Sequence, residues 1–376
     1  MDGTDGFEGI DGTGGIDGMD GYEAVGKTSG WRDRSADARL RVTGADRVEW
    51  LQGLLTNDIA ALAPGGGCYA AYLTPQGRMI ADVRVLARPD HLLLDLPASQ
   101  RSAVRDRLSM FIITEDAAIE DLTDAQARLS LHGPSSTAIL GACVEPTPGP
   151  LELATLAEHA NLTARFDGHE ILLAGTRDLG LPGFDLYVPV EAKAALVAAL
   201  TAQGAAPIGD AAWHTLRVEA GQPLFGVDMT TDTIPLEAGI EERAISFTKG
   251  CYVGQEIIVR VMHRGGGRVA RKLVGLRVEG SGPAVSRLDP QSPIASGDRS
   301  IGSVTSAAWS PRLGAWIALG YVHRDFAEPG PPVSIGPAPT AIAAIVVTLP
   351  HEPAARSRGA APSRAAREDG PTRPTS

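Results

Sequence analysis

Apolar positions along the chain follow two periods, and the change between them marks the elements of a first folded unit. Between Asp46 and Asn57 apolar residues recur every three to four positions, which predicts a helix. Apolar runs on either side of the turns at 75–77 and 88–90 predict strands over 68–74, 79–87 and 91–96. A helix over 99–111 and a strand over 118–122 complete the unit. This order of elements is typical of a ferredoxin-like α+β layer.

A second unit repeats the mixture of strands and helices. Pro134 suits a first helical position and Asp210 suits an N-cap. The expected strands cover 128–132, 171–174 and 184–188, and the expected helices cover 134–143, 192–202 and 210–221. After a run of three glycines at 265–267, short apolar segments separated by Gly and Pro continue to about Leu349, which predicts a small β-barrel.

Both ends of the chain lack periodic apolar residues. The first 21 residues repeat Asp-Gly pairs, and Ala, Pro, Ser and Arg dominate from His351 onward. Such segments cannot bury enough apolar surface to offset the entropy of ordering, so both are expected to be disordered. The expected division is 1–23 as an acidic leader, 24–123 as a first α+β lobe, 124–264 as a second α+β lobe, 265–350 as the barrel and 351–376 as a tail.

Charge and cysteine content narrow the possible partners. The chain has 376 residues and a net charge of −11, so it lacks the excess of cations that nucleic-acid binding needs, and no direct binding is expected. Cys68, Cys143 and Cys251 lie far apart without zinc-type spacing, which predicts neither a disulfide framework nor a metal site and favours the reducing cytoplasm. No apolar run approaches membrane-spanning length, and no signal peptide is expected.

Candidate chemistry concentrates in the octet, residues 249–256, which reads KGCYVGQE and lies in the second expected lobe. A thiolate is the reactive form of cysteine, and Lys249, free backbone N–H groups or a following helix N-terminus would favour it at Cys251. Gly250 and Gly254 allow close approach of the backbone to a ligand. The competing interpretation is that Cys251 is a small buried hydrophobe and that Tyr252 simply packs in a core.

The octet resembles the KGCYxGQE signature of the YgfZ-type folate-binding proteins, a branch of the superfamily that includes the glycine cleavage T-protein, an aminomethyltransferase. Further segments resemble landmarks of that superfamily in the same order: 51–58, Gly77, 183–186, 219–223 and 235–237. The resemblance implies an α+β fold of two interleaved ferredoxin-like domains and a C-terminal β-barrel. The three lobes would surround a central pocket for tetrahydrofolate or a one-carbon derivative, with the first lobe as the folate-binding half.

The resemblance also assigns roles to individual residues. Cys251 becomes the functional thiol, supported by Lys249. Tyr252 becomes a candidate for stacking on the pterin, and Arg260 for binding the glutamate tail or bracing the octet. The remaining expected folate contacts are Asn57, Asp82, Gly250, Gly254, Gln255 and Glu256.

Two departures separate the branches of the superfamily. The T-proteins carry two adjacent acids where this chain has Ala81 and Asp82, and the resemblance ties the first of them to aminomethyl transfer. Alanine can neither accept a proton nor stabilise a cation. The T-proteins also carry a pterin-binding acid just before the landmark at 183–186, where Leu181 and Pro182 stand here.

These departures favour the YgfZ branch. That branch implies a tetrahydrofolate-linked role in assembling or maintaining iron–sulfur enzymes, including those that modify tRNA. One cysteine cannot hold a cluster, which normally needs about four ligands, so Cys251 would act on a client enzyme or assembly protein. Two alternatives stay open: a folate-dependent aminomethyltransferase or demethylase-type one-carbon transfer enzyme, and a non-catalytic folate-binding scaffold.

Overall fold

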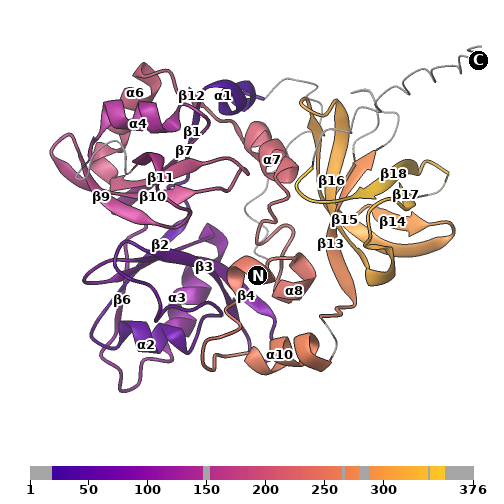
Figure 1. Cartoon of the computed structure of the whole chain (residues 1–376), viewed down its shortest axis with the longest axis horizontal. Coiled ribbons are helices and arrows are strands. Elements are labelled where there is room, and N and C mark those ends of the chain that lie inside the picture. Colours follow the sequence, from indigo (N-terminus) through magenta and orange to yellow (C-terminus); the bar gives the residue numbers. More distant parts are fainter. Residues whose placement is uncertain (1–18, 147–152, 265–266, 279–287, 338, 352–376) are drawn as a thin grey trace, which may run out of the picture.

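Three lobes make up the computed structural model, which describes residues 19–146, 153–264, 267–278, 288–337 and 339–351 (Figure 1). Two of the lobes are mixed α+β layers with five and seven strands, and the third is a closed β-barrel. The predicted fold class is therefore confirmed.

The first lobe is a five-stranded sheet covered on one face by two helices. Its strand order is β3-β4-β5-β2-β6. Its strands are β2 (Ala38–Thr43), β3 (Gly67–Leu73), β4 (Met79–Ala87), β5 (Leu92–Leu96) and β6 (Ala118–Asp121), and its helices are α2 (Arg47–Gln52) and α3 (Arg101–Ser109). Leu51 of α2 and Leu108 of α3 pack against Val83 of the sheet in one core.

The second lobe is a seven-stranded sheet of order β12-β1-β7-β11-β10-β9-β8. Its strands are β1 (Gly30–Asp33), β7 (Gln126–His132), β8 (Glu145–Pro146), β9 (Asn161–Phe166), β10 (His169–Thr176), β11 (Gly183–Pro189) and β12 (Ala206–Pro207). Helices α4 (Ser136–Cys143) and α6 (Lys193–Ala202) cover one face, where Leu140 and Leu196 join the sheet's core.

The two lobes are interleaved, and this moves the expected boundary at residue 24. Strand β1 pairs with β7 and β12 of the second lobe, although it precedes the whole first lobe in sequence. Helix α1 (Tyr22–Lys27) lies beside it and buries Tyr22. Residues 1–18 of the expected leader lie outside the described residues, but Met19 already packs in the cluster of Tyr22. The folded chain thus begins earlier than residue 24.

The octet, expected in the second lobe, packs on the first lobe instead. Tyr252 and Ile258 share a core with Ala71, Leu73 and Met79 of β3 and β4. Three short helices frame this segment: α8 (Pro235–Ala238), α9 (Glu241–Ala244) and α10 (Gln255–Arg264). Sequence reasoning did not identify α10, whose apolar positions are partly occupied by β-branched residues that also suit a strand.

The third lobe is a closed barrel of order β13-β16-β15-β14-β17-β18. Its strands are β13 (Arg271–Val278), β14 (Pro293–Ser296), β15 (Arg299–Ser310), β16 (Ala315–His323), β17 (Pro332–Ile335) and β18 (Ile342–Val347). His351 is buried, and its N–H donates to the carbonyl of Glu219, so the folded part includes the first residue of the expected tail. Residues 352–376 lie outside the described residues.

Helix α7 (Asp210–Glu219) connects the second lobe to the barrel and packs against β15 and β16 (Figure 1). It has ten residues, as do α6 and α10. Across the described part of the chain, no helix combines the length and apolar character needed to cross a membrane.

Candidate functional site

Strand β4 delivers side chains alternately to the first-lobe core and to the interface between the α+β lobes. Ala81, Val83 and Val85 lie in the core with α2 and α3. On the opposite face, Asp82 and Arg84 line a cavity between the lobes. This is the two-residue period of a strand, so an acid at position 82 faces the cavity whereas one at position 81 would face the core.

Neither Ala81 nor Leu181 lines the cavity between the lobes. Ala81 is fully buried in the core, and Leu181 is 37% exposed in the loop before β11. The cavity has carboxyl groups at other positions, among them Asp82 from β4 and Asp178 from the same loop as Leu181.

The cavity has a volume of about 140 Å³ and draws its walls from both α+β lobes and from α7. Tyr69 and Asp82 come from the first lobe, His159 from the second and Trp213 from α7, while Arg243 comes from α9. Of the residues expected to bind folate, Asp82 is the one that lines this cavity. The remaining residues that line the cavity carry no local sequence signal, because their position in its wall depends on how the lobes meet.

Asp82 has one oxygen engaged and one free. Its Oδ2 accepts a hydrogen bond from the Tyr69 hydroxyl at 2.8 Å, while its buried Oδ1 has no partner among the described residues. Burial raises the pKa of Asp82, against the opposing effects of the Tyr69 hydrogen bond and the Arg243 charge. The Arg243 guanidinium lies 4.5 Å from the centroid of the Tyr69 ring. Asp82 is thus a carboxyl group with an unused acceptor in a shielded site.

Beneath the cavity an ion network joins the two sheets. Asp185 pairs with Arg84 and with Arg128, the latter at 2.9 Å. Arg128 also contacts Asp95 at 2.8 Å, and the Tyr187 hydroxyl donates to Asp95 at 2.5 Å. Burial acts to raise the pKa of Asp185, but Arg128, Arg84 and Arg34 hold it well below its usual range. The two carboxylates and the two guanidinium groups neutralise one another and join the two sheets next to the cavity.

The α7 wall is fixed by contacts with the barrel. Arg217 pairs with buried Asp228 at 2.7 Å and donates to the Ser306 hydroxyl of β15 at 2.7 Å. Trp213, one turn earlier, has the Arg32 and Arg34 guanidinium groups 5.2 and 5.3 Å from its ring centroid. The barrel therefore sets how α7 presents its side chains to the cavity.

Lys249 anchors the octet to the end of α2. Its ammonium donates to the carbonyl oxygens of Gln52, Leu55 and Asn57 at 2.6, 2.7 and 2.9 Å. Burial lowers the pKa of Lys249 to about 8, so the group is still mostly cationic at neutral pH. The ammonium thus binds carbonyls of the last residue of α2 and of the turn that follows, lies 5.3 Å from the centroid of the Tyr252 ring, and lowers the pKa of the Cys68 thiol against the larger effect of burial.

Cys251 is exposed, in contrast to the other two cysteines. Burial raises the pKa of the Cys68 thiol to about 12 and raises that of Cys143 above its usual value. Tyr252 is 7% exposed within the core that it shares with β3 and β4. The core-packing interpretation thus describes Tyr252, while Cys251 is accessible to a partner.

The remaining expected site residues surround the octet rather than the cavity. Asn57 donates to the carbonyls of Tyr69 and Arg243 and so ties β3 to α9. Gly254 has a φ of 86°, and a Cβ there would lie 2.5 Å from the Thr74 carbonyl oxygen. Gly250, Glu256 and Arg260 are exposed, and Gln255 is half-buried at the first position of α10. These residues shape the loop that presents Cys251.

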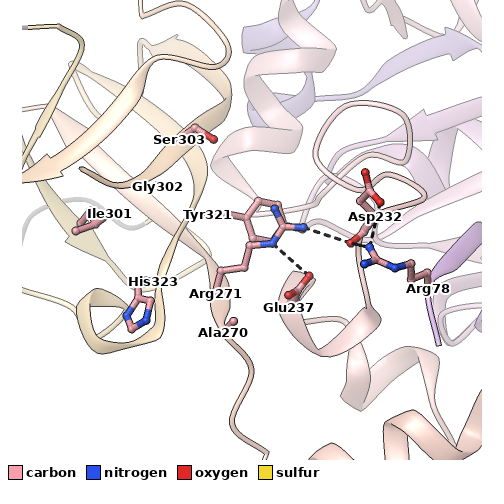
Figure 2. Close-up of a pocket in the computed structure, with 10 residues that line it drawn as sticks. All are labelled: Arg78, Asp232, Glu237, Ala270, Arg271, Ile301, Gly302, Ser303, Tyr321 and His323. Carbon is pink, nitrogen blue, oxygen red and sulfur yellow. Dashed lines mark hydrogen bonds and ion pairs between the residues drawn. The ribbon is translucent and has the colours of Figure 1, made fainter. Parts of the chain in front are cut away.

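A larger cavity, of about 530 Å³, lies between the barrel and α8 (Figure 2). Arg78 pairs with Asp232 at 3.0 Å, and Arg271 pairs with Glu237 at 3.3 Å. The Arg271 guanidinium also lies 4.6 Å from the centroid of the Tyr321 ring. The Tyr321 hydroxyl is buried without a partner among the described residues, so this cavity too has an unused polar group.

Comparison with known proteins agrees with this architecture. The GCVT N-terminal domain family matches residues 19–249, and the glycine cleavage T-protein C-terminal barrel domain family matches residues 271–351. The crystal structure of glycine cleavage system aminomethyltransferase T from Bartonella henselae superposes with a TM-score of 0.78 over 88% of each chain. At 23% identity, that similarity shows a shared fold.

Curated relatives are similar over most of their length. A protein named aminomethyltransferase from Rubrobacter xylanophilus is 34% identical over 305 residues, which is 81% of this chain and 78% of the relative. Another of that name from Streptomyces coelicolor is 34% identical over 316 residues, or 82% of each chain. The family matches and these relatives together show that the chain belongs to the glycine cleavage T-protein family.

Proposed function

We propose that the chain binds tetrahydrofolate, or a one-carbon derivative of it, in the cavity between the two α+β lobes. The relatives named aminomethyltransferase belong to a folate-dependent class, which supports a reduced folate as the ligand. The observation that carries the proposal is the unpartnered Oδ1 of Asp82, which lies buried in this cavity. A buried acceptor without a partner costs free energy unless a ligand donor satisfies it.

The residues present fit a folate. Its pterin offers N–H donors to Asp82 and a flat face to an aromatic ring such as Trp213. The cavity volume of about 140 Å³ is below the roughly 300–1,000 Å³ of a pocket that encloses a whole ligand. The cavity therefore encloses one end of the molecule, and the pterin is the end that matches its polar groups.

Aminomethyl-type one-carbon transfer is the activity that the relatives and the geometry support together. When bound, the folate supplies the nitrogen atoms that accept a one-carbon unit. Asp82 can then accept a proton or stabilise a positive charge beside that unit, because one of its oxygens is free. Tyr69 holds the other oxygen and orients the carboxyl group.

A second candidate function uses the octet. The resemblance of residues 249–256 to the YgfZ signature supports a folate-linked role in assembling or repairing iron–sulfur enzymes, including tRNA-modifying ones. Cys251 is the exposed thiol of the three, and Lys249 holds its loop in place. Because a single thiol cannot hold a cluster, Cys251 would act on a client enzyme or assembly protein. The cytoplasm is the setting that this proposal assumes.

Calorimetry with tetrahydrofolate tests the shared part of both candidates. Binding is expected for the wild type and for Cys251→Ser, and weaker binding for Asp82→Asn. An absence of heat and of any thermal shift at saturating folate would overturn the proposed function. Binding without any effect of Asp82→Asn would place the ligand elsewhere.

Two assays then separate the candidates. An aminomethyl-transfer assay should show activity that Asp82→Asn abolishes and Cys251→Ser leaves intact if transfer is the function. Iron–sulfur enzyme activities in cells lacking the protein should be restored by wild type but not by Cys251→Ser if the octet function holds. Folate binding with neither result would identify a scaffold.

A further inference from the structure

His159 lines the cavity from the second lobe, whereas Tyr69 and Asp82 line it from the first lobe. Its Nδ1 is buried and has no hydrogen-bond partner among the described residues. Four residues that line the cavity carry a buried polar atom without a partner among the described residues: Asp82 (Oδ1), His159 (Nδ1), Arg84 (Nε) and Arg128 (Nε). Buried polar atoms in native proteins are usually satisfied, so a group of them around one cavity points to a ligand.

The backbone of His159 has a positive φ, which His adopts more readily than most residues other than glycine. Its φ is +65°, in the left-handed region, where non-glycine residues are uncommon. Its N–H donates to the Gly175 carbonyl at 2.9 Å, and Arg84 donates to the same carbonyl. Gly67 packs directly against the backbone of His159, because a Cβ at position 67 would lie 2.4 Å from the His159 carbonyl oxygen. Strained residues fixed in this way cluster at functional sites.

We propose that His159 is a ligand-recognition residue that hydrogen-bonds the nitrogen-rich ring of a reduced folate from the second lobe, while Asp82 does so from the first lobe. This inference rests on the proposed function. It adds one residue to the binding site and names the end of the ligand that this residue contacts. Asp82 supplies an acceptor, and the imidazole supplies one acceptor and one donor. Such a pair matches a heterocycle edge that carries both N–H donors and ring nitrogen or carbonyl acceptors.

The charges around the ring keep the imidazole neutral. Burial lowers the pKa of His159 to about 3, with a further lowering from Arg84 and Arg243 that exceeds the opposing effects of Asp178 and Asp185. Glu158, the adjacent acid, has its Oε1 3.8 Å from the ring Nε2. A neutral ring cannot attract the carboxylate tail by charge, which again favours the pterin end. The contribution of His159 to affinity should therefore be constant between pH 5 and 8.

Calorimetry on the full chain tests this with three probes: tetrahydrofolate, 6-methyltetrahydropterin as the ring half, and p-aminobenzoylglutamate as the tail half. His159→Phe keeps a flat ring without nitrogen atoms, and His159→Asn keeps a polar group and tolerates a positive φ. His91→Phe, in the turn between β4 and β5 and outside the cavity lining, is the matched control.

His159→Phe should weaken binding of tetrahydrofolate and of the pterin about 5- to 20-fold, as expected for the loss of one or two hydrogen bonds. Binding of the tail half should be unchanged, His159→Asn should recover part of the loss, and His91→Phe should bind like wild type. Nitrogen NMR of the histidine rings at pH 6 should show His159 neutral.

Equal affinities of wild type and both His159 variants would overturn the inference while leaving the proposed function intact. A loss confined to the tail half, or an imidazolium signal at pH 6, would also overturn it. Absence of folate binding by the wild type would overturn the proposed function and this inference with it.

Discussion

Adjacent residues of β4 point to opposite faces of its sheet, so only one of the two can reach a ligand in the cavity between the lobes. Asp82 lines the cavity between the lobes, whereas Ala81 is packed in the first-lobe core. The environment of Asp82 also sets its acidity, because burial raises its pKa while one oxygen stays free. A carboxyl group with a raised pKa and an open acceptor suits proton transfer near neutral pH better than a solvated one.

Replacing Asp82 with asparagine should weaken folate binding and abolish any one-carbon transfer, yet stabilise the free protein. A raised pKa means that the folded state binds the proton more tightly, so the ionised group costs stability at neutral pH. That cost disappears as the pH falls through the folded pKa. The melting temperature of Asp82→Asn should exceed that of wild type by about 1–3 °C at pH 7 and by less at pH 4. A lower melting temperature at pH 7 would contradict this.

Cys251 should be the first cysteine to react with iodoacetamide at neutral pH. It is exposed, whereas burial raises the pKa of both Cys68 and Cys143 and so reduces their thiolate fraction. Peptide mass spectrometry after brief labelling gives the rate at each cysteine, with urea-unfolded protein as the control for intrinsic reactivity. Labelling of Cys251 only in the unfolded protein would assign it a packing role.

At the scale of elements, strands and loops act as units that carry side chains to fixed places. Strand β4 separates a core face from a cavity face, and the octet forms a loop between α9 and α10 that is tied to α2 by Lys249. The three carbonyls bound by Lys249 belong to the last residue of α2 and the turn that follows. A cation at this position also interacts favourably with the helix C-terminus.

Introducing an acid at position 81 should not create a transferase. Ala81→Asp would place a carboxylate in the apolar core of α2, α3 and the sheet, where burial penalises its charge. The free energy of unfolding should fall by about 3 kcal/mol or more, measured by urea unfolding. Aminomethyl transfer should not rise. A stable variant with increased activity would show that position 81 reaches the cavity.

Lys249→Met should destabilise the protein by about 2–4 kcal/mol, because three carbonyls lose a charged donor and two of the donor's contacts are partly buried. Lys193→Met is the matched control, since Lys193 forms a surface ion pair with Asp33 and should cost about 1 kcal/mol or less. Chemical unfolding measures both. Equal losses would indicate that the Lys249 contacts add nothing beyond a surface pair.

If Lys249 also activates Cys251, iodoacetamide labelling of the variant should be slower and shifted to higher pH.

At the scale of the whole molecule, the function depends on how three lobes meet. The ion network of Arg84, Arg128 and Asp185 joins the two sheets beneath the cavity. On the barrel side, Glu219 accepts hydrogen bonds from the Tyr22 and Ser310 hydroxyls, each at 2.5 Å. Buried networks of this kind are fully effective only when every member is present. They therefore fix the relative positions of the lobes and the width of the cavity.

Asp185→Asn should destabilise the protein by about 3–5 kcal/mol at pH 7, since it leaves two buried guanidinium groups short of a counter-ion. The neighbouring arginines hold the pKa of Asp185 far below its unfolded value near 4, so its contribution is present above about pH 4 and decreases below it. Melting curves from pH 7 to pH 3 should show the gap between wild type and variant narrowing below about pH 4. A gap that stays constant would contradict this assignment.

The sequence alone determined many of the elements and their order, although not α10. The strand expected over 79–87 is β4 with the same bounds, and the helix expected near Asp210 is α7. Both follow from periodicity, which involves residues close together in the chain, whereas the expected cap was wrong: Gly209 is the N-cap of α7 and Asp210 is its first residue. The octet likewise identified an accessible thiol, because its composition is unusual for a core.

Only the tertiary structure decided which of these residues share a site. Strand β1 joins the second sheet after the chain has built the first lobe elsewhere, and Lys249 finds its partners some two hundred positions earlier in the sequence. His159 had no local signal at all, since only the packing of the two lobes makes it line the same cavity as Asp82. The partners of buried polar groups are set by contacts between distant segments, and periodicity within one segment carries no information about them.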